Sequence, residues 1–470
     1  MGRTLITAVA ALGVVAAAQQ NPNAPSNFVK VNASVVILTN ARVIDGTGAP
    51  ARDNQNVVIR GDTIAEVADV VRIDRPPRDA VILDLAGKTV IPGLVMMHEH
   101  LFYPTGPGVY GQLGESFVRL YLAAGVTTMR TGGNVNGIMD INLARRIAAG
   151  EATGPEVDAT APYLNGPSTF LQMQTVNTPD EARKHVAYWA EQGATSLKAY
   201  MQISRAALGA GIDEAHKRGL KVTGHLCSVT YSEAADLGID NLEHGFMPAT
   251  DFVADKQPDV CPMPQARGQQ TIAALDEHAP AFTALVKKLV DKHVALTSTL
   301  TVFETFTPGR PMPPGLDVLT SQLQDNFRGA RERVEANPQS NYAKLFPKGM
   351  ALERAFARAG GVLIAGTDPT GSGGVVPGYA DQRQIELLVE AGFTPEEAIR
   401  ICTLNGAMFL GRDKQIGTIA PGKQADFVIV NGNLSTTIAD VRRVETVFKK
   451  GVGYDPVKLI DSVKGHVGLW

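Results

Sequence analysis

From Gly93 onward, short apolar runs alternate with longer amphipathic stretches, and this alternation is the feature that most constrains the fold. The amphipathic stretches, at 114–124, 180–192, 205–218 and 281–292, repeat their apolar residues at helical spacing. Strands that alternate with helices form a parallel sheet, and eight such strands favour a closed barrel. We therefore expect an α/β fold with strands at 94–97, 126–130, 156–161, 196–199, 221–224, 241–243, 295–298 and 362–365.

Strand-like runs also lie on both sides of this region. Residues 34–92 contain five of them, separated by Gly-containing turns, and this part is expected to form a small antiparallel sheet. Residues 415–460 return to the same pattern, with runs at 417–419, 426–431 and 444–449. Two β segments that flank a barrel can pair with each other. We therefore predict one small unit built from both segments beside a barrel of residues 93–414.

The first residues have the pattern of a signal peptide. Arg3 supplies the positive charge, residues 5–15 form an apolar run, and Ala16–Ala18 offers a small-residue cleavage site. We expect cleavage near Ala18, a polar linker over 19–33, and a periplasmic or secreted protein whose mature chain has no membrane span. An uncleaved anchor is the alternative. Only three cysteines are present, so at most one disulfide can form within the chain, among Cys227, Cys261 and Cys402.

Composition is that of an ordinary globular protein, with 44% apolar and 19% charged residues. The formal net charge of -3 offers no basic field that would attract nucleic acid. We therefore expect the partner to be a small-molecule or dipeptide substrate, and a homo-oligomer is compatible with the sequence.

Six polar residues follow the expected strands at their carboxyl ends, where barrel enzymes place their active sites. Imidazoles and carboxylates that converge there are ligands for divalent metal ions. The six candidates are His98, His100, Lys198, His225, His244 and Asp368.

Local spacing separates the roles of some of these residues. His98 and His100 are two apart on one strand and face the same way, whereas Glu99 points to the other side and serves as a wall or supporting group. Lys198 would be a costly buried charge without a partner. It is either converted by carbon dioxide to a carbamate that bridges two metals, or it remains a salt-bridged or substrate-binding lysine. Asp368 is a metal ligand, a general base or both.

The remaining histidines lie in helical, loop or tail contexts and are expected to be packing or surface residues. They are His185, His216, His278, His293 and His466.

The order HxH, Lys, His, His, Asp over successive strands resembles the amidohydrolase superfamily, and most of all its imidazolonepropionase-like and prolidase-like branch of binuclear hydrolases. The resemblance extends over nearly the whole mature chain, in TNARVIDGTG, KTVIPGLVMMHEH, AAGVTTMR, NLEHG and GTIAPGKQADFVIV. It implies a distorted (β/α)8 TIM barrel with a composite β-sandwich formed from residues 34–92 and 415–460.

The resemblance also implies roles for the six candidates. His98, His100 and Asp368 would hold one divalent metal, expected to be zinc, His225 and His244 would hold a second, and carboxylated Lys198 would bridge the two. A hydroxide shared by both metals would attack an amide carbonyl. Asp368 would then take the proton and pass it to the leaving amine.

The chain departs from the family pattern at two places. The second strand of related proteins commonly ends in Arg-Asp-Leu-Gly, but residues 130–133 read Arg-Thr-Gly-Gly. Many relatives have a histidine after the third strand, where this chain has Tyr163 in Pro-Tyr-Leu-Asn. Tyr163 is either an oxyanion donor or a packed side chain. Tyr231 matches a position at which some relatives bind a substrate carboxylate.

The function predicted from these observations is that of an exported metal-dependent amidohydrolase that cleaves a dipeptide or an N-acyl amino acid. One alternative is a mononuclear deaminase of a heterocycle, against which Lys198 argues because such an enzyme needs no bridging lysine. Another is a lactonase, because the same hydroxide attacks esters. A non-catalytic binding protein on a barrel is a fourth possibility, although all six positions carry competent groups. Substrate specificity is expected to lie in loops such as 163–174, 250–270 and 306–347, of which the last two are long insertions.

Overall fold

The computed structural model describes residues 23–468 except 71–76, 107, 168–171 and 265. The expected signal peptide, residues 1–18, lies outside the described residues, as does the start of the expected linker. Among the helices in the described ranges, none combines the length and the apolar character needed to cross a membrane.

Eight parallel strands form the centre of the molecule, and each coincides with a run predicted from the sequence. They belong to two sheets, in the orders β11-β10-β7 and β12-β13-β14-β15-β16, and every pairing is parallel. The eight strands are β7 (Leu94–Glu99), β10 (Val126–Thr131), β11 (Glu156–Asp158), β12 (Ser196–Ala199), β13 (Lys221–Gly224), β14 (Asn241–Glu243), β15 (Ala295–Ser298) and β16 (Leu363–Ala365).

Hydrogen bonds link the two parallel sheets at both edges. Beyond the end of β11, isolated parallel bridges pair Thr160 with Ser196 and Leu164 with Ala199, which join this segment to β12. At the other edge, the backbone N–H groups of Thr367 and Asp368 both donate to the carbonyl oxygen of His98, at 3.1 and 3.0 Å. The segment that follows β16 is therefore hydrogen-bonded to the end of β7, which is the first of the eight parallel strands in the chain.

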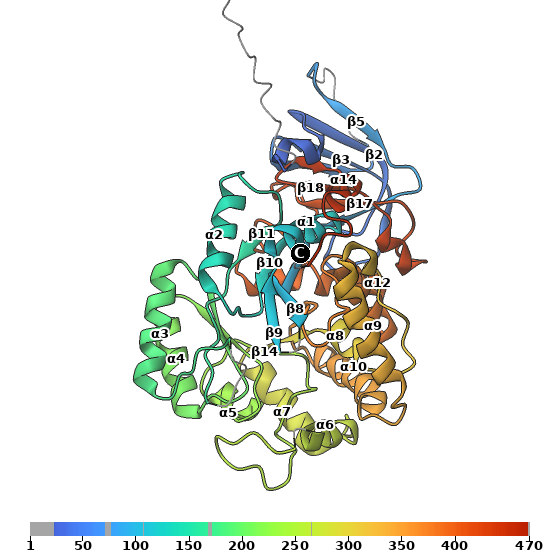
Figure 1. Ribbon diagram of the computed structural model, residues 1–470. Coiled ribbons are helices and arrows are strands. Elements are labelled where there is room, and N and C mark those ends of the chain that lie inside the picture. Colours follow the sequence, from blue (N-terminus) through green and yellow to red (C-terminus); the bar gives the residue numbers. More distant parts are fainter. Residues whose placement is uncertain (1–22, 71–76, 107, 168–171, 265, 469–470) are drawn as a thin grey trace, which may run out of the picture.

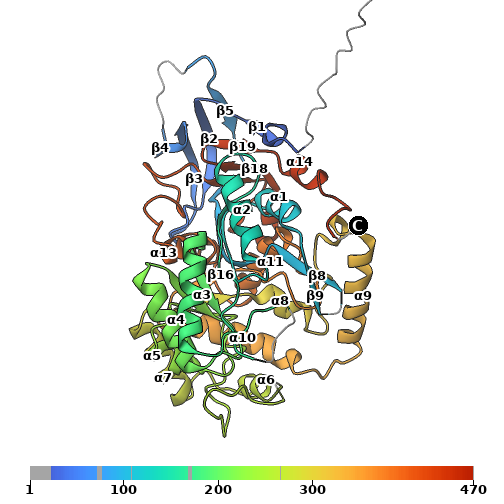
Figure 2. The same ribbon diagram turned by 60° about the vertical axis from the view of Figure 1, so that its left-hand side comes forward.

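Helices connect the parallel strands, and the four predicted amphipathic stretches correspond to α1, α3, α4 and α7. In both views, α3 and α4 lie on one side of these strands and α9 on the other (Figures 1 and 2). The helices are α1 (Gly114–Ala123), α2 (Gly137–Ala148), α3 (Pro179–Gln192), α4 (Arg205–Lys217), α5 (Tyr231–Asp236), α6 (Ala266–Ala273), α7 (Pro280–Asp291), α8 (Leu300–Thr305), α9 (Ser321–Glu335), α10 (Tyr342–Arg358), α11 (Tyr379–Glu390), α12 (Pro395–Ile401), α13 (Leu404–Phe409) and α14 (Pro456–Asp461).

Local signals explain where α3 begins and ends. The side chain of Thr178 accepts a hydrogen bond from the backbone N–H of Glu181, and Pro179 occupies the first helical position, where its missing N–H costs nothing. Gly193 ends the helix with φ of 99°, a left-handed conformation that glycine adopts without steric strain.

A nine-stranded sheet at the top of Figure 1 combines both ends of the chain. Its order is β1-β19-β18-β17-β6-β2-β3-β4, and β5 pairs with β2. The strands are β1 (Val29–Val31), β2 (Val35–Val43), β3 (Arg52–Arg60), β4 (Thr63–Ala68), β5 (Val81–Asp84), β6 (Thr89–Pro92), β17 (Phe427–Val430), β18 (Val444–Lys449) and β19 (Val452–Tyr454).

Three details of this sheet differ from the sequence prediction. The sheet is mixed rather than antiparallel, because β5 and β6 both run parallel to β2. Residues 417–419 do not form a strand. Part of the expected linker is structured: a 3-10 helix, Pro25–Phe28, leads into β1, which pairs with β19. The sequence alone does not reveal this strand, because its pairing partner lies at the far end of the chain.

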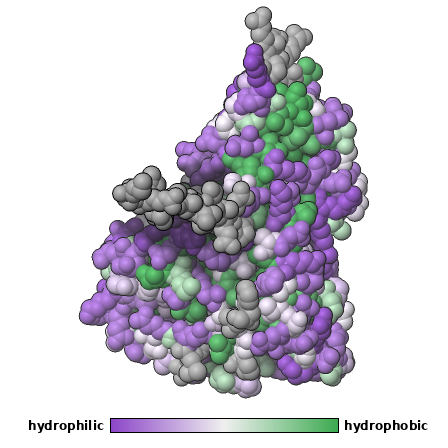
Figure 3. All heavy atoms as spheres, turned by 45° about the horizontal axis from the view of Figure 1, so that its top comes forward, coloured by the Kyte–Doolittle hydropathy of each residue, from purple (hydrophilic) through white to green (hydrophobic). Residues whose placement is uncertain are grey.

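Apolar side chains of the nine-stranded sheet are largely buried. The face of the molecule shown in Figure 3 is mainly hydrophilic, and its apolar residues gather toward the upper end of the picture. Val36 and Leu38 of β2 are completely buried, whereas Ile82 of β5 is 61% exposed. β5 is therefore covered on one face only.

The two long insertions contain helices. The first ends in α6, and its Cys261 forms a disulfide with Cys227, which follows β13. The second contains α9, the start of α10 and a 3-10 helix at Leu316–Val318. Cys402 is free and buried, so the chain forms the single disulfide that three cysteines allow.

We predict that replacing both Cys227 and Cys261 by serine lowers the free energy of unfolding by about 2–4 kcal/mol, because the crosslink restricts the unfolded chain. Urea denaturation measures this loss. Reductant should lower the midpoint of the wild-type protein and leave that of the double variant unchanged. A wild-type midpoint that is insensitive to complete reduction would contradict the prediction.

Candidate metal centre and active site

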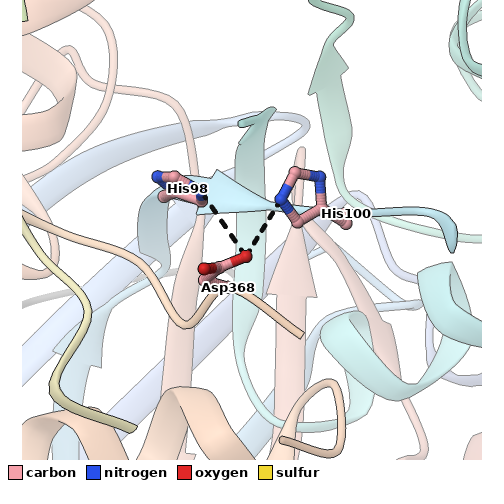
Figure 4. Close-up of side chains that lie close together, drawn as sticks. All are labelled: His98, His100 and Asp368. Carbon is pink, nitrogen blue, oxygen red and sulfur yellow. Dashed lines mark ion pairs between the residues drawn. The ribbon is translucent and has the colours of Figure 1, made fainter. Parts of the chain in front are cut away.

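The closest group of potential metal ligands consists of His98, His100 and Asp368. The two histidines lie at the end of β7, and Asp368 follows β16 (Figure 4). Asp368 Oδ1 is 3.1 Å from His100 Nε2 and 3.7 Å from His98 Nε2. One ligand atom from each of the three buried residues lies within 4.8 Å of the others. The spacing of this group suits one divalent ion.

The imidazoles are oriented through their Nδ1 atoms. His98 Nδ1 lies 2.7 Å from Glu243 Oε2, and His100 Nδ1 lies 3.0 Å from the carbonyl oxygen of Gly133. His244 Nδ1 lies 2.8 Å from Thr299 Oγ1. A partner at Nδ1 fixes the tautomer and leaves Nε2 as the coordinating atom, which is how metal-binding histidines are usually held. The donor set therefore fits a metal ion.

Two candidate ligands have left-handed backbone conformations. His244 has φ of 68° and Asp368 has φ of 55°. Such conformations are uncommon for residues other than glycine and cluster at functional sites, where the surrounding structure holds them in place. Gly366 allows the chain to approach β7, because a Cβ at that position would lie 2.4 Å from the backbone nitrogen of His98.

Lys198, His225 and His244 complete the six predicted residues, and all three line the same cavity as the group of three. The ring of His244 is 4.6 Å from that of His98 and 4.4 Å from that of His225, centroid to centroid. Burial lowers the pKa of His98 to about 4 and of His225 to about 3, so these imidazoles are neutral at pH 7. The structure thus brings all six predicted residues together.

Lys198 is 1% exposed, and its ammonium lies 3.3 Å from Glu243 Oε1. Burial lowers its pKa to about 8, which the nearby carboxylate only partly opposes.

Glu243 is a functional residue that the sequence analysis missed. It is completely buried on β14, and its two oxygens contact three groups: Arg130 at 2.7 Å, His98 at 2.7 Å and Lys198 at 3.3 Å. Although burial favours the neutral form, the charges of Lys198 and Arg130 hold the pKa of the Glu243 carboxyl well below its usual range. The alternation of side chains along β14 is the signal in the sequence that could have identified Glu243, because it directs this side chain toward the other parallel strands.

The unusual residues at 130–133 also have roles in the structure. Arg130 Nε donates to the carbonyl oxygen of Met97, and a further guanidinium nitrogen donates to Thr223. Gly132 packs against His98 so closely that an added Cβ would lie 2.4 Å from the imidazole ring. The carbonyl of Gly133 orients His100, as described above. This segment therefore supports the histidines without containing an acidic residue.

Glu99 faces away from the ligands, as predicted. Its carboxylate accepts hydrogen bonds from the backbone N–H of Thr367, at 2.9 Å, and from the Thr367 hydroxyl. Because Thr367 immediately precedes Asp368, Glu99 helps to place that ligand.

The ligands lie at the floor of a cavity of about 1220 Å³, part of which is open to solvent. Tyr163 lines this cavity and packs against Tyr200, with ring centroids 5.0 Å apart. Tyr231 does not line it. Its hydroxyl donates to the carbonyl oxygens of Glu243 and Gly245, at 3.0 and 2.9 Å. The expectation that Tyr231 binds a substrate carboxylate is therefore wrong, because the side chain points into the core.

None of the five remaining histidines is among the described residues that line the cavity. His185, for example, is buried on α3, and its Nε2 lies 2.9 Å from the carbonyl oxygen of Pro162.

Comparison with known proteins identifies the family. The model of the amidohydrolase family matches residues 89–453. An imidazolonepropionase of Alkaliphilus metalliredigens is 24% identical over 412 residues, which cover 84% of this chain and 89% of that protein. A dihydroorotase of Anaeromyxobacter dehalogenans is 36% identical over 124 residues, which are 25% of this chain and only 27% of that protein.

A solved structure gives the same result. The crystal structure of a candidate prolidase from Bifidobacterium longum superimposes with a TM-score of 0.64 at 26% identity, over 92% of this chain and 99% of that chain. The chain belongs to the amidohydrolase family. Within that family it falls with the imidazolonepropionase-like and prolidase-like members, and it is a hydrolase that acts on carbon–nitrogen bonds.

We predict that Glu243→Gln lowers the free energy of unfolding by about 3–5 kcal/mol, because it leaves buried cations without their carboxylate. It should also weaken zinc binding by about 10–100-fold, since His98 loses its orienting partner. Urea denaturation and zinc titration measure the two effects. Asp291→Asn, which removes one half of the exposed pair with Lys287, is the control and should cost less than about 1 kcal/mol. Equal effects of the two substitutions would argue against the role of Glu243.

Proposed function

We propose that this protein is a metal-dependent hydrolase of an amide bond, and that its parallel strands close into a distorted (β/α)8 barrel carrying the site. A composite β-sandwich of residues 34–92 and 415–460 would accompany a barrel of residues 93–414. The observation that carries the functional proposal is the convergence of His98, His100 and Asp368 with three further candidate ligands in one cavity.

The proposed site holds two divalent ions, of which zinc best suits the nitrogen and oxygen donors. His98, His100 and Asp368 would hold the first, and His225 and His244 the second. Carboxylated Lys198 would bridge them. When bound, two such ions supply the acidity that makes water nucleophilic at neutral pH and polarise the carbonyl that is attacked.

Asp368 is the residue that we assign to proton transfer. Its Oδ1 lies 3.1 Å from His100 and its Oδ2 lies 3.8 Å from His244, so the carboxylate stands between the two groups of histidines. From this position it can orient the attacking water, accept its proton and return that proton to the leaving nitrogen. The hydroxyl of Tyr163 is the proposed hydrogen-bond donor to the carbonyl oxygen.

A mononuclear deaminase is the second candidate, and one observation favours it. The compact group of three, His98, His100 and Asp368, can hold a single ion without the other ligands. Metal stoichiometry distinguishes the two functions.

Two further proposals concern the protein in the cell. The pattern of residues 1–18 supports export to the periplasm or beyond, with cleavage near Ala18. A small-molecule or dipeptide substrate and a homo-oligomeric state are compatible with the fold. The next two predictions test the metal site itself.

The purified protein is expected to contain about two divalent ions per chain by elemental analysis. A chelator should abolish amide hydrolysis, and zinc should restore it. Full activity with one ion per chain would reject the binuclear site and favour the deaminase.

Lys198→Ala should lose metal and activity together if the lysine is a carbamate bridge. Acetate or propionate added with zinc should then restore part of both, because a small carboxylate fits the space that the side chain leaves. Bulky acids are expected to do nothing. Lys198→Ala that retains two metals and shows only a raised KM would indicate a substrate-binding lysine instead.

A further inference from the structure

Aromatic side chains form one wall of the cavity beside the metal centre. They come from a hairpin of β8 (Phe102–Gly106) and β9 (Val109–Gln112), which directly follows the two ligand histidines. Phe102 stacks on the imidazole of His100 with ring centroids 4.3 Å apart, and Tyr110 packs against Phe102 at 5.1 Å. The apolar wall therefore begins in contact with a candidate ligand.

A second aromatic group lies on the side of His244. Phe303, on α8, is 5.9 Å from the His244 ring, and Tyr342, at the start of α10, is 6.4 Å from Phe303. Phe306 packs against Tyr342 at 5.2 Å. Met201 and Met247 also line the cavity. Both sides of the site thus contribute rings or thioethers to its walls, and Phe306 and Tyr342 come from the second insertion.

The walls have no cation that could pair with an anionic group. Lys198 is the sole Lys or Arg among the described residues that line the cavity, and it lies at the floor, 3.3 Å from Glu243. Arg130 is directed to Glu243, Thr223 and a backbone carbonyl. The residues between 100 and 380 outside the described ranges are 107, 168–171 and 265, and by sequence none of them is Lys, Arg or His.

This distribution of charge restricts what the cavity can bind. The scissile bond has to reach Asp368 at the floor, so the substituents on both sides of it have to extend along the aromatic walls. A carboxylate placed there would lose hydration and find no Lys or Arg side chain among the described residues of the walls to pair with, which is unfavourable. An uncharged ring or branched chain would gain from burial against aromatic side chains and methionines.

We propose that the substrates are uncharged amides that carry an aromatic or bulky apolar group, and that the site discriminates against amides with a carboxylate beside the scissile bond. The inference rests on the proposed amide hydrolysis and departs from the dipeptide or N-acyl amino acid expected from the sequence. Specificity then comes from the neutral walls, and the metal centre supplies only the chemistry common to all amides.

A matched pair of amides tests this proposal. N-acetyl-2-phenylethylamine and N-acetylphenylalanine have the same acyl group, ring and scissile bond, and differ only in the carboxylate. With zinc-loaded protein, kcat/KM for the neutral amide should exceed that for the acid by about tenfold or more. Release of the free amine reports both reactions. An acid that is cleaved as well as or better than the neutral amide would overturn the inference and leave the proposed hydrolysis intact.

A new cation in the wall provides a second test. Gln269, on α6, lines the cavity, and its Nε2 donates to the Tyr342 hydroxyl at 2.9 Å. Gln269→Arg should reduce the preference for the neutral amide by improving kcat/KM for the acid. Gln270→Arg adds the same charge to the exposed neighbouring residue, which does not line the cavity, and should leave the preference unchanged. An identical preference in wild type and Gln269→Arg would count against neutral walls as its origin.

Binding separates the inference from the proposed function. Calorimetry on the wild-type protein stripped of metal by a chelator compares the affinities of the two amides without turnover. Tighter binding of the neutral amide supports the inference even if the wild-type protein hydrolyses neither compound, in which case only the proposed reaction fails. Equal affinities, or tighter binding of the acid, would refute the inference regardless of turnover.

Discussion

The buried carboxylate of Glu243 connects the metal ligands to the rest of the parallel strands. It accepts from Arg130 on β10, lies within contact distance of Lys198 on β12, and orients His98 on β7. These partners come from three different strands, so a single side chain links the positions of two candidate ligands, His98 and Lys198, to that of Arg130. A buried carboxylate is stable only when its oxygens are paired with cations or hydrogen-bond donors, and here both oxygens are so paired.

Two candidate ligands near this network have strained backbone conformations. His244 and Asp368 both leave their strands in left-handed conformations, which cost about 1–3 kcal/mol each. The cost is offset by close packing and by hydrogen bonds to the backbone, such as those from Thr367 and Asp368 to the carbonyl of His98. Glu99 fixes Thr367 from the opposite face. Rigid placement of ligands before metal arrives favours binding, because less ordering is then required.

The cavity above this floor has a different physical character. Its floor contains nearly all of the charge, whereas its walls contain methionines and aromatic rings, among them rings from the β8–β9 hairpin and from the second insertion. The disulfide between Cys227 and Cys261 ties the first insertion to the segment that follows His225. The candidate metal ligands and the apolar walls are therefore contributed largely by different parts of the chain. Insertions can change the walls without disturbing the paired charges beneath them.

The sequence by itself determined the eight parallel strands and the six polar residues at their ends, because strand periodicity and chain order are local properties. It also predicted that Glu99 faces away from His98 and His100. It did not reveal the pairing of Glu243 with Arg130 and Lys198, the burial of Tyr231 against backbone carbonyls, or the pairing of β1 with β19. Only the tertiary structure decided these features, because each depends on partners that are distant in sequence and meet only when the strands align.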